Sequence, residues 1–109
     1  MNILGFVQRL WGASIPVLCY HQVRPASGMS PEKFGQHLDL LHNLGLRTIT
    51  LNQLLKVIQG QEKLNFPAMV ITFDDCTLDN WIYAVPQLLQ RQMVAVFFAI
   101  TDFIHEGPV

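Results

Sequence analysis

Residues 69–76, Met-Val-Ile-Thr-Phe-Asp-Asp-Cys, constrain the fold of this chain more than any other segment. The run up to Phe73 is apolar and partly β-branched, which predicts a buried strand. Two adjacent carboxylates, Asp74 and Asp75, follow at once. An ionised carboxylate is costly to bury without a partner, so we expect the pair at a cleft mouth just past the strand. In α/β folds, ligands and catalytic groups gather at that end of the strands.

The composition is that of one globular domain. The chain has 109 residues, of which 50% are apolar and 14% charged, and its net charge is −1. These values exclude a disordered chain and a basic nucleic-acid-binding surface. We find no stretch suited to a transmembrane helix and no clear signal peptide. We therefore expect no nucleic-acid partner and no transmembrane segment, and the location, cytoplasmic or cell-envelope associated, stays open.

Strands and helices are expected to alternate. Apolar runs predict four strands, at residues 15–20, 46–50, 68–73 and 94–100. The last run is continuous enough to predict burial on both faces. This order favours an α/β fold with a parallel sheet and right-handed crossovers.

The connections carry signals for helix starts. Ser30 followed by Pro31 predicts an N-cap and first turn, and Thr50 with Gln53 has the spacing of a capping box. We expect a third helix to reach about residue 92, capped by Thr77 or Asp79, with Asp79 and Asn80 orienting it. Four aromatic residues are expected in the core: Trp81, Tyr83, Phe97 and Phe98.

Asp74 and Asp75 suit two different tasks. Neighbouring side chains in an extended chain point to opposite sides. One carboxylate can therefore bind a divalent cation while the other acts on a bound water or substrate. The alternative is a pair of solvated acids that cap the following helix.

Several motifs together resemble a known family. They are Val-Ile-Thr-Phe-Asp-Asp at 70–75, Asp79-Asn80, Ala-Val-Pro at 84–86, Leu88-Leu89, Ala-Val-Phe-Phe at 95–98, Pro-Val-Leu-Cys-Tyr-His-Gln-Val at 16–23, and Phe34, His37, Leu38, Leu41 and Gly45. The chain thereby resembles the polysaccharide deacetylase (NodB-homology, carbohydrate esterase) family, most of all its poly-N-acetylglucosamine deacetylase branch. The resemblance implies the amino-terminal portion of a distorted (β/α) barrel with parallel strands, incomplete in this chain. Residues 1–14 would be an extension and residues 15–109 a truncated deacetylase domain.

The resemblance also implies a function in carbohydrate metabolism. It implies metal-dependent hydrolytic deacetylation of an N-acetylated polysaccharide, with a divalent metal, most often zinc. In the family motif Asp74 would be the catalytic base and Asp75 a metal ligand. His21 would line the substrate cleft, and a loop histidine bonded to backbone is its alternative.

The chain departs from the family pattern in two places. The metal motif His-x-x-x-His is absent, because the spacings of His21, His37, His42 and His105 do not match it. We therefore expect an incomplete ligand set and an inactive isolated fragment, with a non-catalytic remnant or interaction fragment of the same fold as the alternative. The unpaired strand at 94–100 would then favour self-association.

The second departure concerns a cysteine. Cys76 stands where the family usually has glycine, and it is either tolerated at negative φ or distorts the loop. We expect Cys76 and Cys19 to be free, buried thiols, although the two could be neighbours in space. His37 and His42 are expected on the surface or in a groove of a helix.

Overall fold

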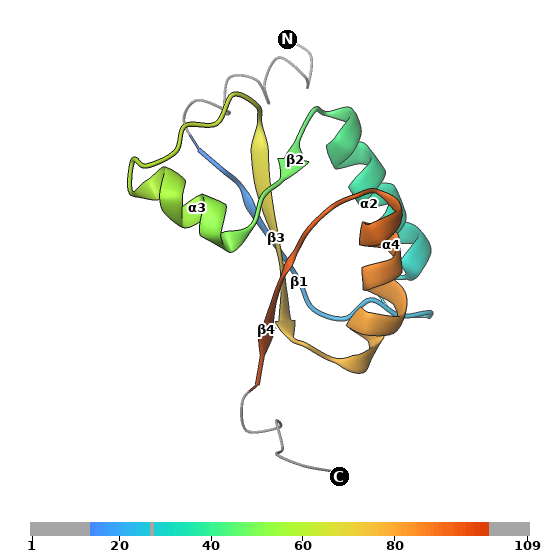
Figure 1. Cartoon of the computed structure of the whole chain (residues 1–109). Helices are drawn as coiled ribbons and strands as arrows, with labels where there is room; N and C mark the ends of the chain where they lie inside the picture. The colour runs from blue at the N-terminus through green and yellow to red at the C-terminus, as the bar shows by residue number, and fades with distance from the viewer. Residues whose placement is uncertain (1–13, 27, 101–109) are drawn as a thin grey trace.

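Strands and helices alternate in the computed structural model, which describes residues 14–26 and 28–100 (Figure 1). The elements are β1 (Val17–Tyr20), α2 (Pro31–Asn43), β2 (Arg47–Thr48), α3 (Leu51–Ile58), β3 (Ala68–Asp75), the π-helical segment η1 (Asn80–Ala84), α4 (Val85–Gln90) and β4 (Val96–Ala99). The predicted α/β class with parallel strands is confirmed. The extension expected at residues 1–14 falls almost wholly outside the described part.

Strand β3 is the centre of the sheet. Strand β1 pairs with it along one edge, β2 and then β4 pair with it along the other, and all pairs are parallel. Tyr20 lies opposite Phe73, and Asp74 lies opposite Phe98. The carboxyl ends of β1, β3 and β4 therefore meet at one edge, where the acidic pair stands.

One face of the sheet packs against α2 and α4, which lie together on the same side in Figure 1. Phe73 lies at the centre of the core on this face and is fully buried. The Phe73 ring centroid lies 5.6 Å from that of Tyr20, 5.7 Å from that of Phe34 and 4.9 Å from that of Phe97. These offset and edge contacts join β1, α2, β3 and β4 in one aromatic cluster.

The opposite face carries a smaller core. Ala68 and Val70 alternate with the residues of the first face, as a strand requires, and they pack with Ile49. Leu54 of α3 is partly buried against this cluster. The rest of the apolar stripe on α3 is exposed in the described part of the chain: Leu51, Leu55 and Ile58.

The first two helices begin as their sequences predict. The Ser30 hydroxyl accepts a hydrogen bond from the Lys33 N–H at 3.2 Å. The Gln53 N–H donates to Thr50 Oγ1 at 3.1 Å, and the Gln53 side chain accepts from the Thr50 N–H at 2.9 Å, which completes the capping box. Both helices satisfy orphan N–H groups in this way, and so their starts are readable from local sequence.

The third helix differs from its expectation. Neither Thr77 nor Asp79 caps it, because the Asp79 carboxylate is bonded elsewhere and the Thr77 hydroxyl has no partner among the described residues. The chain instead makes a π-helical turn, in which the Val85 N–H donates to the Asn80 carbonyl. Pro86 follows within the first turn of α4 and has no N–H to donate, which accounts for the irregular entry into this helix.

An ion pair ties α4 to α2. Arg91 donates from Nε to Asp39 Oδ1 at 2.8 Å and from its second amino group to Oδ2 at 3.2 Å. This fork geometry is the strong form of an arginine–carboxylate contact. The hydrogen bond from Arg91, with its positive charge, lowers the pKa of Asp39.

Two of the four expected core aromatics are exposed. Trp81 is 71% exposed and Phe98 is 50% exposed, whereas Tyr83 and Phe97 are partly buried against the main core. The expected burial of residues 94–100 on both faces is likewise wrong for the described chain, because β4 is half-buried at its start and exposed at its end. β4 has no strand on its outer edge among the described residues. No helix within the described ranges has the length and hydropathy to cross a membrane.

Candidate metal and catalytic site

Asp74 is the centre of a polar cluster at the carboxyl end of the sheet. Its Oδ2 lies 3.4 Å from Cys19 Sγ, which donates a hydrogen bond, and 3.9 Å from His21 Nε2. The side chain of Asp74 is 41% exposed and that of His21 is 68% exposed. The carboxylate is therefore open to solvent and still within reach of two other chemically active groups.

Strand pairing explains why these residues meet. β1 runs parallel to β3 with Tyr20 opposite Phe73, so the next residue on each strand, His21 and Asp74, stand level at the strand ends. Cys19 and His21 are two residues apart and so lie on the same side of an extended chain. The expected neighbourhood of His21 and Asp74 follows from this register.

The loop that carries His21 is held by the residues after the acidic pair. The buried Asn80 donates from Nδ2 to the His21 carbonyl at 2.9 Å, and Asp79 accepts from the Val23 N–H at 2.8 Å. Asp79 and Asn80, expected to cap a helix, thus connect the end of β3 to the end of β1. Their side chains hold the backbone of the His21 loop in place.

Asp75 and Cys76 turn the chain away from β3. Asp75 has φ 71° and Cys76 has φ 48°, both in the left-handed region, and both residues are exposed. Asp tolerates this region better than most residues, whereas cysteine gains nothing there. Of the two alternatives for Cys76, tolerance at negative φ is therefore wrong. Both thiols are free, as expected, but both are exposed, so the expectation that they are buried is wrong.

This backbone predicts that Cys76→Gly stabilises the chain. Relief of the left-handed strain, about 1–2 kcal/mol, exceeds the extra entropy of an unfolded glycine, so the net gain is expected to be about 0.5–1 kcal/mol. Urea denaturation followed by circular dichroism measures it. Cys76→Ala is the control, since it removes the thiol and keeps the strain. An equal gain in both variants would place the effect in the thiol and contradict this explanation.

Cys19 is the member of the cluster that the sequence interpretation missed as a site residue. The available signal was its position two residues before His21 in a predicted strand, which places both side chains on one side. Its thiol donates a hydrogen bond to the carboxylate of Asp74. Cys19, His21 and Asp74 each offer one ligand atom, and these atoms lie within 4.8 Å of one another.

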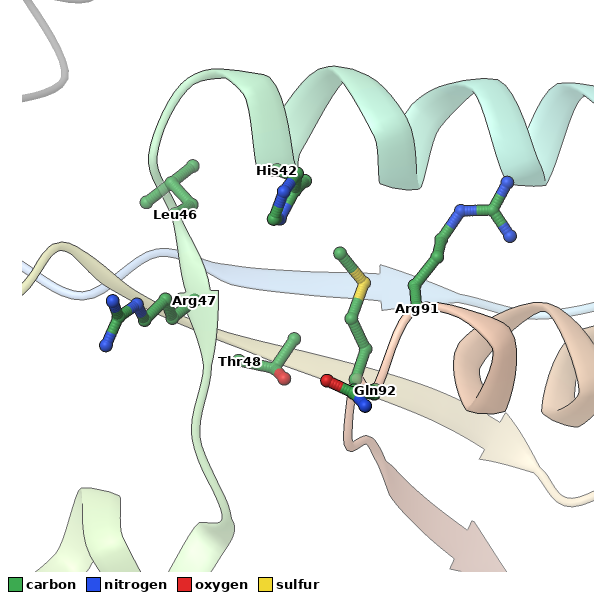
Figure 2. A pocket seen from close by; sticks show the side chains of 7 residues that line it. His42, Leu46, Arg47, Thr48, Arg91 and Gln92 are labelled. Carbon is green, nitrogen blue, oxygen red and sulfur yellow. The ribbon is translucent and has the colours of Figure 1, made fainter.

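A hollow with charged walls lies elsewhere (Figure 2). It has a volume of about 280 Å³ and lies at the amino-terminal end of β3, beside β2 and the ends of α2 and α4. Arg91 is already paired with Asp39, and the guanidinium of Arg47 lies 5.1 Å from the ring centre of Phe66. These cations are engaged in structural contacts at the opposite end of the sheet from Asp74, so the hollow forms no part of the candidate site.

His37 and His42 are exposed, as expected. His42 lines the hollow of Figure 2, and His37 Nδ1 lies 3.4 Å from the hydroxyl of Tyr20. Burial raises the pKa of Tyr20, which keeps its hydroxyl protonated. Neither histidine belongs to a group of potential metal ligands in the described ranges.

The chain is similar to known polysaccharide deacetylases in sequence. The chain is 32% identical over 90 residues, 81% of its length, to YxkH of Bacillus subtilis (strain 168), which carries the name of a polysaccharide deacetylase. It spans only 32% of that protein, about a third of the relative's length. No protein-family model matches the chain.

Solved structures agree with this relationship. IcaB from Ammonifex degensii matches with a TM-score of 0.72 and 34% identity, over 78% of this chain and 37% of that one. Two more match in fold: the Streptococcus pyogenes deacetylase PplD in complex with acetate (TM-score 0.73, 24% identity, 80% of this chain and 42% of that one) and a de-N-acetylase from Aggregatibacter actinomycetemcomitans (0.74, 21%, 85% and 40%). The predicted resemblance to polysaccharide deacetylases is confirmed, and the chain has part of their α/β fold.

Proposed function

We propose that this chain is part of a metal-dependent carbohydrate deacetylase that hydrolyses N-acetyl groups of a polysaccharide. The observation that carries the proposal is the position of Asp74 and Asp75 at the end of the central strand, with Asp74 beside His21, in a chain similar to polysaccharide deacetylases. Residues 15–109 would form this part of the domain, and residues 1–14 an extension before it.

Asp74 is assigned the proton-transfer role. Its half-exposed carboxylate can accept a proton from a water molecule at the carboxyl end of β3, which is the task of a general base. The thiol of Cys19 donates to the same oxygen and helps to hold its orientation. His21 lies beside it and is open to solvent, which suits a residue that lines a substrate cleft.

Asp75 is assigned to the cation. A divalent metal such as zinc supplies Lewis-acid chemistry and lowers the pKa of a water molecule when it is bound. A catalytic zinc site has three protein ligands and an open position. Within the described ranges the group with ligand spacing contains Asp74 and not Asp75, so Asp75 would be one ligand of a set that these residues leave incomplete.

This incompleteness favours an isolated chain without turnover. The alternative, a non-catalytic remnant or interaction fragment of the same fold, also predicts no turnover by the isolated chain. A chimera separates the two: IcaB from Ammonifex degensii with its matching segment replaced by that of this chain, called the IcaB chimera below. The 34% identity between the two segments makes the exchange feasible.

The test is release of acetate from an N-acetylglucosamine oligomer. We expect the isolated chain to release none, and the IcaB chimera to release acetate in the presence of Zn²⁺ and to stop when a chelator removes it. Unaltered IcaB is the positive control. A folded chimera without activity, tested beside active IcaB, would favour the non-catalytic alternative. Turnover by the isolated chain would contradict the proposal that its set of metal ligands is incomplete.

A further inference from the structure

Cys19, His21 and Asp74 place three different ligand atoms close together. Cys19 Sγ lies 3.4 Å from Asp74 Oδ2, His21 Nε2 lies 3.9 Å from the same oxygen, and all three atoms are within 4.8 Å of one another. In a tetrahedral zinc site with ordinary bond lengths, ligand atoms are separated by roughly 3.3–3.6 Å. The widest observed separation, up to 4.8 Å, needs a closure of about 1.2–1.5 Å to reach this geometry.

The backbone under these side chains is fixed, while the side chains themselves are free to close. Asn80 holds the His21 carbonyl, and Cys19 and Asp74 belong to paired strands. Cys19 and His21 are both exposed, so rotation about their side-chain bonds meets little packing resistance. The backbone positions of such a site are therefore set before a metal binds, and side-chain rotation can bring the ligand atoms together.

We infer that Cys19, His21 and Asp74 form a three-ligand site for a thiophilic divalent metal ion such as Zn²⁺, Co²⁺ or Cd²⁺, separate from the cation assigned to Asp75. Thiolate and imidazole ligands select such metals over Mg²⁺ and Ca²⁺. On binding, the S–H bond of Cys19 breaks, a sulfur–metal bond forms, and the proton passes to water. Water fills the fourth position.

This metal site does not depend on the proposed deacetylase function, but the two share one side chain, that of Asp74. A carboxylate oxygen that coordinates the metal is withdrawn from proton transfer. An ion bound here therefore inhibits the reaction proposed above, and the same side chain serves two exclusive states. Removal of the thiol separates these states, because it weakens the metal site and leaves Asp74 in place.

Co²⁺ titration of the 109-residue chain under reducing conditions is the test. We expect binding of one equivalent, a thiolate-to-cobalt charge-transfer band in the near ultraviolet, and displacement by Zn²⁺. Cys19→Ser is expected to abolish the band, and His21→Gln and Asp74→Asn to weaken binding by more than about tenfold. Cys76→Ser and Asp75→Asn are the controls and should leave the band unchanged.

The outcomes distinguish this site from the proposed function. Absence of the band in the folded chain, its persistence in Cys19→Ser, or its loss in Cys76→Ser would each overturn the inference. Loss in Asp75→Asn would place the metal with the other carboxylate and would also overturn it. Circular dichroism of each variant shows that the fold is retained, and the acetate assay of the IcaB chimera tests the deacetylase proposal independently.

Discussion

Replacement of Phe73 by alanine is expected to lower the free energy of unfolding by about 3–5 kcal/mol, as for other large aromatic residues truncated in a core. Phe73 is fully buried, and its ring meets those of Tyr20, Phe34 and Phe97. The substitution leaves a cavity where β1, α2, β3 and β4 join, and a loss of this size is a large part of the stability of a small domain. Urea denaturation followed by far-ultraviolet circular dichroism measures it.

Trp81→Ala is the matched control. Trp81 is larger than Phe73, but it is 71% exposed, so its removal is expected to change stability by no more than about 0.5 kcal/mol. Phe73→Leu, which keeps most of the apolar volume, should fall between the two. Equal losses in Phe73→Ala and Trp81→Ala would show that the aromatic cluster around Phe73 is not the core of the chain.

The second large effect is expected at Asp74. In the IcaB chimera, Asp74→Asn should lower kcat for acetate release by about 10²–10⁴-fold, the usual contribution of a general base. Asparagine keeps the size and a hydrogen-bond acceptor for Cys19 but cannot take a proton at neutral pH. The KM is expected to change little, since the role is in proton transfer and not in substrate binding.

His37→Gln serves as the control for this measurement. His37 contacts Tyr20 on the helix side of β1 and has no contact with Asp74 in the described structure, so kcat should stay near that of the unaltered chimera. Retention of full activity in Asp74→Asn would remove Asp74 from the mechanism. A rise in KM alone would assign it to substrate binding.

Local signals in the sequence were sufficient for the elements that depend on local chemistry. The starts of α2 and α3 follow from Ser30 and from the pair Thr50 and Gln53, because each cap is completed within one helical turn. The central strand follows from its apolar run and the acids that end it. These features need no partner from a distant part of the chain.

Other features depend on tertiary partners and could not be predicted from a single segment. Asp79 is a residue type that often caps helices. Its carboxylate instead accepts a hydrogen bond from the N–H of Val23, 56 positions away in sequence. Trp81 and Phe98 look like core residues by type, but they are 71% and 50% exposed. Hydrophobic character indicates what a side chain prefers and not what lies next to it.

The candidate site was predicted in outline. The neighbourhood of His21 and Asp74 follows from two parallel strands that end at the same edge, which the alternation of elements already predicts. Cys19 was missed because a cysteine in an apolar strand resembles a small core residue. Only the register of β1 against β3 shows that its thiol faces the carboxylate. The roles of Asp74, Asp75 and His21 remain predictions.

The central claim, that the two neighbouring carboxylates divide proton transfer and cation binding, is tested most directly by measuring bound zinc and acetate release in the same samples of the IcaB chimera. All samples carry Cys19→Ser, so that the thiolate contributes no metal site. We predict that Asp75→Asn loses both the zinc and the turnover, whereas Asp74→Asn keeps the zinc and loses the turnover. Full zinc content and full turnover in Asp75→Asn, or loss of zinc in Asp74→Asn, would contradict the division.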